Sequence, residues 1–381
     1  MIILGIIVAI AIGLFWLILE QDIPGLWKFL LVFIEMLAVS QIFIKRYKLP
    51  SELGLVLIKS KKGIDLIDKI SKSGKIFDFL SDVGNSIAYG LLSLVITRKN
   101  TTPVKLVLGL AILAVVSLLV APTAWFLLSG LMGVGGEDGD SVKSISNDNG
   151  LISLPVVAGL LLVGGLFLFI LFGIVYYGAV VLSRVINYLA FGNTDILTTE
   201  PGGTFLLPGV NLPLFEGIIA LTIVMIVHEG AHAILARIGK VPIESSGIVL
   251  FGIIPVGAFV EPDEEKLRKT DQIRQTRVLV AGATSNLLTS CLVFALFFAF
   301  AWTANGFGLG QNDAVVFVKT TLMLTFALNF IVGAVNLLPL PVFDGYRIIE
   351  TNIKNKLVVQ AIMYVALISF ALNFLPWFFH A

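Results

Sequence analysis

The chain has 381 residues, of which 57% are hydrophobic and only 13% are charged, and its formal net charge is +1. Soluble domains contain about 45–50% apolar and about 25% charged residues, so this composition excludes a water-covered surface and predicts lipid as the surrounding solvent. The balanced charge leaves no electrostatic footprint for nucleic acid. Because the chain has one cysteine, a disulfide framework and a cysteine-rich metal site are both excluded.

Apolar stretches in chain order predict an all-α polytopic membrane protein. A spanning helix needs about 20 apolar residues. The first stretch is interpreted as a retained helix, with a cleaved signal peptide as the alternative. The run at 152–183 suits one tilted crossing or two short ones, and a run at 83–97 is too short to predict a span. The predicted spans are 2–19, 24–44, 105–131, 152–183, 216–238, 278–303, 314–338 and 357–379.

Charged segments predict the topology. The loop 45–82 is rich in lysine, so the positive-inside rule places it in the cytoplasm. The basic residues of the loop 261–277 indicate the same side. If each predicted span after the loop 45–82 crosses the membrane once, however, the C-terminal end of the span 216–238 lies outside the cytoplasm. One further crossing is therefore required, either from 83–97 or from a split of 152–192.

The chemistry centres on a histidine pair at the end of an apolar run. His228 and His232 are four residues apart, and Glu229 follows the first of them. On a helix this spacing puts both imidazoles on one face, where they can share a metal ion, and the glutamate projects towards a metal-bound water as a general base. Ionisable groups are costly inside a membrane helix, so the pattern favours a metal site over a chance match.

A zinc hydrolase needs a third protein ligand and an open position for water. The carboxylates near apolar segments are Glu35, Glu216, Glu261 and Asp344. Asp344 is favoured, because two prolines and a glycine break the membrane helix around it. Irregular backbone at membrane depth occurs only where it is buried in protein or lines a wet cavity. The alternative is an ordinary turn residue, since Asp-Gly is common in turns.

Three motifs in this order, HEGAH at 228–232, AGATSN at 281–286 and NLLPLPVFDG at 336–345, resemble those of the site-2 protease family of intramembrane zinc metalloproteases. The stretch 245–265 resembles archaeal members in particular. The resemblance covers roughly residues 205–350. It implies one Zn²⁺ per chain.

The resemblance also implies roles for individual residues. His228, His232 and Asp344 would bind the zinc, and Glu229 would activate the water and then protonate the leaving amine. These roles agree with the reading of the histidine pair from its spacing alone.

Two asparagines complete the expected site. Asn336 is expected to position substrate or stabilise the oxyanion, and Asn286 to be a polar neighbour of the reacting groups. Ala283 stands where the family has a proline, which makes the role of Asn286 less well defined. For both asparagines the alternative is a hydrogen bond between helices.

The resemblance further implies a re-entrant β-like hairpin at 245–260, whose open edge could hold an extended substrate by strand addition. Many family members insert a PDZ domain between the motif-bearing helices, but here only residues 304–313 separate two spans. A member without a PDZ domain is therefore expected.

The expected organisation has a three-helix catalytic core, built by the spans 216–238, 278–303 and 314–338, the last with a broken extension. The expected parts are N-terminal membrane helices with a basic cytoplasmic loop at 1–132, an acidic flexible loop at 133–150, additional membrane segments at 151–204, the zinc protease core at 205–350 and a C-terminal membrane helix at 351–381.

The expected function is hydrolysis of a peptide bond of transmembrane substrates within or near the bilayer. The expected partners are a transmembrane protein substrate and lipid, with the active site nearer the cytoplasmic side of the cell membrane. Two alternatives remain at this stage. One is another membrane zinc protease with a glutamate as third ligand, and the other is a transporter or scaffold with a degenerate metal site.

Overall fold

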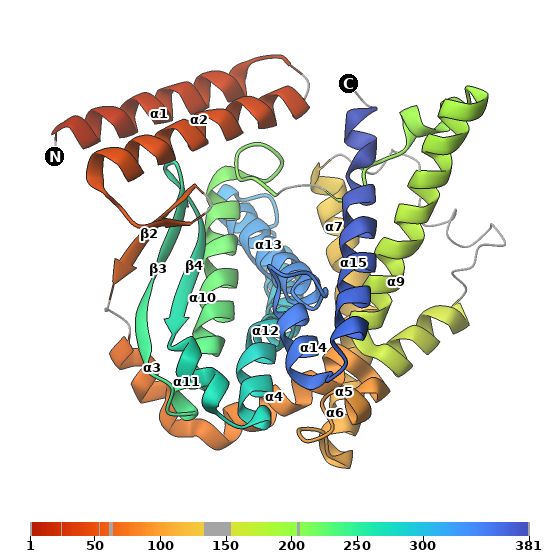
Figure 1. The fold of residues 1–381 in the computed structure, drawn as a ribbon. Coiled ribbons are helices and arrows are strands. Elements are labelled where there is room, and N and C mark those ends of the chain that lie inside the picture. The colour runs from red at the N-terminus through yellow and green to blue at the C-terminus, as the bar shows by residue number, and fades with distance from the viewer. Residues whose placement is uncertain are drawn as a thin grey trace.

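A computed structural model describes residues 2–23, 25–52, 54–60, 64–132, 154–203 and 206–379. It shows a helical protein with one small sheet, as predicted (Figure 1). The acidic loop predicted at 133–150 lies outside the described residues.

The described residues form fourteen α-helices and four strands. The helices are α1 (Ile2–Glu20), α2 (Gly25–Tyr47), α3 (Ile64–Ile70), α4 (Gly74–Tyr89), α5 (Ser93–Ile96), α6 (Pro103–Val115), α7 (Ala121–Met132), α9 (Leu154–Phe191), α10 (Leu214–Ile238), α11 (Glu264–Lys269), α12 (Gln272–Gly306), α13 (Asp313–Val335), α14 (Asp344–Asn352) and α15 (Lys356–Asn373). The strands are β1 (Ser51–Glu52), β2 (Leu55–Ser60), β3 (Ile243–Phe251) and β4 (Ile254–Pro262).

Within the described residues, nine helical segments are long and apolar enough to cross a membrane. Eight of them overlap the eight predicted spans. The ninth, Ile64–Ile96, joins the end of the lysine-rich loop 45–82 to the short apolar run at 83–97, and residues 81–89 are all buried. This segment is therefore a candidate for the additional crossing that the topology requires.

The long helix α9 is broken at Gly165, as its length suggested. Gly165 has φ 61° and ψ −158°, and an added Cβ would lie 2.5 Å from the carbonyl oxygen of Ala88 and 2.6 Å from the nitrogen of Gly90. Only glycine allows this backbone conformation together with such a close approach. The break thus divides α9 into a short first arm and a long second arm (Figure 1).

The predicted hairpin is present, but it belongs to a larger sheet. The strand order is β1-β2-β3-β4, and every pair is antiparallel. The N-terminal strand β2 pairs with β3 from Val56↔Leu250 to Ser60↔Ser246. Among the described residues β4 has a strand partner on one side alone, and its other edge faces α10 (Figure 1).

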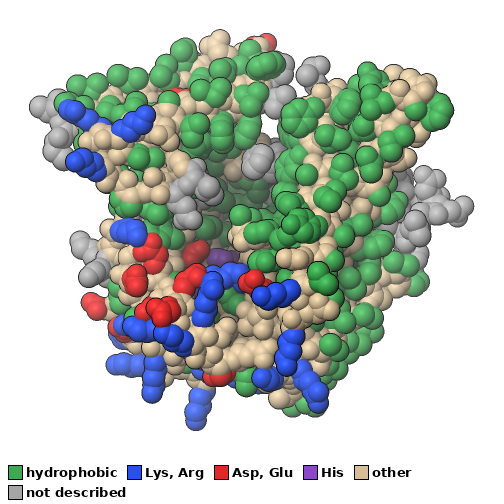
Figure 2. Space-filling view, in the orientation of Figure 1, with side chains coloured by type: hydrophobic (Ala, Val, Ile, Leu, Met, Phe, Trp, Pro, Cys, Tyr) green, Lys and Arg blue, Asp and Glu red, His purple; other side chains and the backbone are tan. Residues whose placement is uncertain are grey.

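The helices α10, α12 and α13 pack on one another, in line with the expected three-helix core. Figure 2 shows a hollow between the layer formed by α1, α2 and the sheet and the layer formed by α15 and α9. Hydrophobic side chains line its upper part, and a histidine is visible at its base. The helix α10, which carries the histidines of the described residues, therefore reaches the base of this hollow.

Candidate metal centre

The helix α10 carries two of the predicted ligands on one face. It begins after Pro213 and runs without a break to Ile238, so His228 and His232 lie one turn apart. Their Nε2 atoms are 3.2 Å apart. The apolar residues before the pair bury this helix against α12, and His228 is only 6% exposed.

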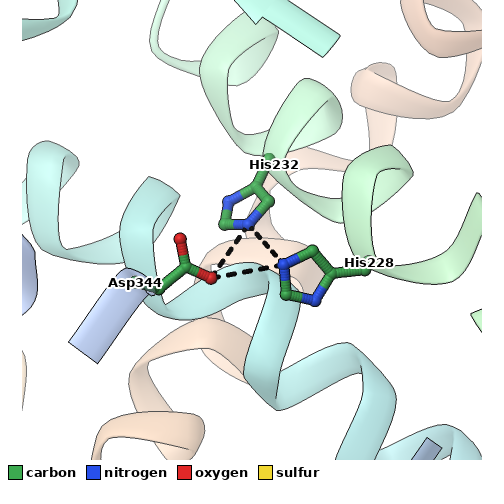
Figure 3. A group of neighbouring side chains, drawn as sticks. All are labelled: His228, His232 and Asp344. Carbon is green, nitrogen blue, oxygen red and sulfur yellow. Dashed lines mark hydrogen bonds and ion pairs between the residues drawn. The ribbon is translucent and has the colours of Figure 1, made fainter. Parts of the chain in front are cut away.

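A closed loop between α13 and α14 brings the third predicted ligand to this pair. The predicted span 314–338 ends earlier, at Val335, because the prolines that follow cannot continue the helix. The N–H of Gly345 donates to the carbonyl oxygen of Asn336 across the loop, at 2.7 Å. As a result, Asp344 is the first residue of α14 and its side chain points at both imidazoles (Figure 3).

The three ligand atoms form a triangle of the size that zinc requires. Oδ2 of Asp344 lies 3.3 Å from Nε2 of His228 and 3.2 Å from Nε2 of His232 (Figure 3). A tetrahedral zinc with ligands at 2.0–2.1 Å would separate them by about 3.3 Å. Within the described part of the chain, Oδ2 is buried and makes no hydrogen bond. A cation shared by the three side chains would satisfy it.

The ligand set remains accessible from one side. The side chains of His228, His232 and Asp344 are 8%, 13% and 15% exposed. On the opposite side Gly282 of α12 lies so close that an added Cβ would be 2.4 Å from Nε2 of His232. The centre is thus backed by α12 and open to the hollow, which suits a catalytic site with a free coordination position.

Each histidine is oriented through its other ring nitrogen. Nδ1 of His232 lies 2.7 Å from the carbonyl oxygen of Val278, which can only accept, so Nδ1 carries the proton and Nε2 keeps its lone pair for a metal. Nδ1 of His228 lies 3.3 Å from the side-chain amide of Asn286. Turned so that its oxygen faces the ring, this amide would accept the Nδ1–H of His228.

Glu229 lies beside the ligands on the face of α10 that meets the sheet. Its carboxylate is half-buried and receives a backbone hydrogen bond from Val260 of β4. The glutamate is therefore held between the ligand triangle and the open edge of the sheet.

The two predicted asparagines occupy different places. Asn286 is fully buried behind His228, away from the hollow. The side-chain amide of Asn336 donates to the carbonyl oxygen of Val332, at 2.9 Å, and its backbone closes the loop that carries Asp344. The structure thus brings His228, His232 and Asp344 together, with Glu229 alongside, and places both asparagines next to ligand-bearing elements.

Of the other carboxylates weighed as ligands, none belongs to the metal-binding group found among the described residues. Glu261 instead accepts hydrogen bonds from Lys59 of β2, at 2.5 and 2.8 Å, and from Ser245 of β3. These contacts, the one from Lys59 foremost, hold the pKa of Glu261 below its ordinary value. This glutamate therefore joins the strands of the sheet.

Sequence reasoning missed three groups at the centre. The carbonyl of Val278 and the N–H of Val260 are backbone groups, which every residue has, so no side-chain pattern marks them. Gly282 stands in the AGATSN motif, and the motif's glycine was the available signal.

Comparison with known proteins finds one family model that matches the region containing this site. Residues 216–376 match the model of peptidase family M50. An uncharacterized protein of Methanocaldococcus jannaschii is 40% identical over 77 residues, which cover 20% of this chain and 21% of that protein. The aligned segment thus spans about a fifth of that relative. No solved structure matches the chain.

The matched region includes α10, α12 and α13 and all three residues of the triangle. Over residues 216–376 the chain is therefore similar to peptidase family M50, the site-2 protease family.

Proposed function

We propose that this protein is an intramembrane zinc metalloprotease that hydrolyses a peptide bond of transmembrane substrates within or near the bilayer. One observation carries the proposal: two imidazoles and a carboxylate converge on one point at the base of an apolar-walled hollow, with a glutamate beside them (Figures 2 and 3). The family match to residues 216–376 supports a metallopeptidase.

His228, His232 and Asp344 would hold the zinc, since their spacing fits a tetrahedral cation and Oδ2 of Asp344 is buried without a hydrogen bond in the described part of the chain. When bound there, zinc acts as a Lewis acid that lowers the pKa of water and polarises a carbonyl group. Asn286 would fix the ring of His228 from behind, and Asn336 would hold Asp344 in place through its backbone and offer an amide near the reacting carbonyl.

Glu229 is the general base of the proposed reaction. Its carboxylate takes a proton from the attacking water, and the resulting hydroxyl oxygen adds to the peptide carbon. The same glutamate then returns the proton to the leaving nitrogen as the C–N bond breaks. The hydrogen bond from Val260 keeps the carboxylate on the side of the ligands that faces the sheet.

The open edge of β4 is the proposed substrate platform. A helical substrate hides its peptide bonds, so a segment must become extended before water can reach the carbonyl carbon. Such a segment could pair with β4 as an added strand. Since β2 already occupies the outer edge of β3, and β4 runs past Glu229, pairing at β4 delivers the peptide bond to the metal centre.

The proposed active site lies nearer the cytoplasmic side. Lys and Arg side chains gather mainly over the half of the molecule in which the histidine is seen (Figure 2). That half includes α11, with Lys266, Arg268 and Lys269 in its last turn. The positive-inside rule assigns such a surface to the cytoplasm.

The proposal is tested by purifying the chain in mild detergent and measuring its zinc content. A reporter with one apolar helix between two soluble tags then serves as substrate. We expect about one zinc per chain and reporter cleavage that stops with a chelator and returns with zinc. A metal-free protein would overturn the proposal, and a zinc-bound protein that leaves the reporter intact would favour a non-enzymatic membrane protein with a degenerate metal site.

A further inference from the structure

The helix α4 lies outside the family-matched region, yet it packs directly on α12 (Figure 1). At Gly84 the two helices approach so closely that an added Cβ would lie 1.7 Å from Oγ1 of Thr284. The half of α4 that makes this contact is fully buried. α4 is thus part of the wall behind the metal centre.

Three residues of α4 hold Arg277 of α12, and the first of them, Asp78, accepts a hydrogen bond from Nη1 of Arg277 at 2.8 Å. Asp82 is 0% exposed and accepts hydrogen bonds from Nε and Nη2 of Arg277, at 2.8 and 2.6 Å. Lys105 also donates to Asp82, at 2.7 Å. The hydroxyl of Ser81 donates to the carbonyl oxygen of Arg277, at 2.8 Å. Arg277 is therefore held by its guanidinium group and by its backbone at once.

Arg277 directly precedes the residue that orients a predicted metal ligand. The carbonyl oxygen of Val278 accepts the hydrogen bond from Nδ1 of His232, at 2.7 Å. The backbone of α12 at these two residues is thus held by α4 on one side and bonded to His232 on the other. A two-point, charge-assisted contact fixes both the orientation of the Arg277 guanidinium group and its distance from Asp82. A single hydrogen bond would leave the orientation free.

We propose that Ser81 and Asp82 are positioning residues of the metal centre. By fixing the backbone of α12 at Arg277, they keep the Val278 carbonyl where it sets the ring orientation and tautomer of His232. The inference rests on the proposed function, because it assumes that His232 binds a metal. It follows that residues 216–376 do not build the metal centre alone.

The test measures metal binding by the full-length protein in detergent, with Zn²⁺ competed by a chelator and with Co²⁺ followed by its visible spectrum. Ser81→Ala removes one hydroxyl, Asp82→Asn removes the charge, and Ser81→Thr restores a hydroxyl. The matched control is Ser86→Ala, because Ser86 is also a fully buried serine of α4 whose hydroxyl makes no hydrogen bond with the described residues.

We expect Asp82→Asn to weaken Zn²⁺ binding by about tenfold, the lower end of the effect of changing a group that supports a metal ligand. Ser81→Ala should weaken it by a smaller factor, and both should change the Co²⁺ spectrum. Ser81→Thr and Ser86→Ala should leave affinity and spectrum as in the parent.

The proposal is overturned if Ser81→Ala and Asp82→Asn reduce the melting temperature while the Zn²⁺ affinity and the Co²⁺ spectrum stay as in Ser86→Ala. The helix α4 would then serve stability alone. If Asp82→Asn does not fold, the comparison of Ser81→Ala with Ser86→Ala decides. Absence of stoichiometric metal in the parent would instead overturn the proposed function, so the two failures are distinguishable.

Discussion

Oδ2 of Asp344 lies 3.2 Å from Nε2 of His232, although the two residues come from helices far apart in the chain. The hydrogen bond between Gly345 and Asn336 closes the loop that makes this meeting possible. An added Cβ at Gly345 would lie 2.1 Å from the carbonyl oxygen of Leu337, so glycine is required next to the aspartate.

Asp344→Ala should remove most of the bound zinc, because two imidazoles alone form an incomplete site. The zinc content is measured on protein that keeps the parent's circular dichroism spectrum. Glu216→Ala is the matched control, since Glu216 belongs to α10 but not to the ligand triangle. Full zinc retention by Asp344→Ala would show that another residue, such as a glutamate, is the third ligand.

Gly282→Ala should also abolish metal binding. The added methyl group would lie 2.4 Å from Nε2 of His232 and 2.5 Å from Cε1 of His228, so the imidazoles would have to move. Gly230→Ala is the control on α10, because no other group of the described chain lies within 4 Å of an added Cβ there. Equal zinc content in both variants would contradict the geometry of the triangle.

Asn286→Ala should weaken zinc binding by about tenfold, since it removes the group that faces Nδ1 of His228. Asn329→Ala is a suitable control: Asn329 is equally buried, and among the described residues its amide donates only to the carbonyl oxygen of Thr325 on its own helix. Chelator competition gives both dissociation constants. A loss of affinity shared by both variants would indicate a general packing effect.

Val260→Pro should lower the cleavage rate while leaving zinc content unchanged. Proline removes the N–H that bonds to Glu229. Val260→Ala keeps the N–H and should behave as the parent. Reporter cleavage and zinc content are measured on the same samples, and a fully active Val260→Pro would show that this hydrogen bond is not needed to hold Glu229 for catalysis.

Lys59→Ala should lower stability near neutral pH by less than about 1 kcal/mol, because both partners of the Lys59–Glu261 pair are about a third or more exposed. The folded-state pKa of Glu261 is lowered, so its contribution is present above the unfolded value of about 4.3 and is lost as the pH falls through the folded value. Thermal unfolding of parent and variant should therefore differ at pH 7 and converge in acid. If the parent and the variant still differ in melting temperature in acid, the effect would come from packing of the lysine side chain's aliphatic part.

The grouping of His228, His232 and Asp344 was predictable because its sequence signals are local. The spacing of His228 and His232 is a helical repeat, and Asp344 sits where prolines must end a helix. The membrane helices were predictable from their lengths, although α13 ends before the predicted 338.

The rest depends on contacts between distant segments. Nothing within residues 55–60 indicates that they pair with β3, because such a strand is specified by its partner. Likewise, the fit of Gly84 against Thr284 and the contacts of Asp82 with Arg277 and Lys105 depend on how helices pack. From the sequence, the segment Ile64–Ile96 was therefore interpreted as the end of a basic loop followed by an apolar run too short to span the membrane.

Glu229→Gln tests the central claim most directly. The zinc-loaded variant and the zinc-loaded parent are compared at equal metal content on the single-helix reporter, and the cut position is mapped by mass spectrometry. We expect the parent to cut within or near the apolar helix, and the variant to bind zinc but not to cut, because an amide cannot take the proton from water. Cleavage by Glu229→Gln at the parent's rate would contradict the account.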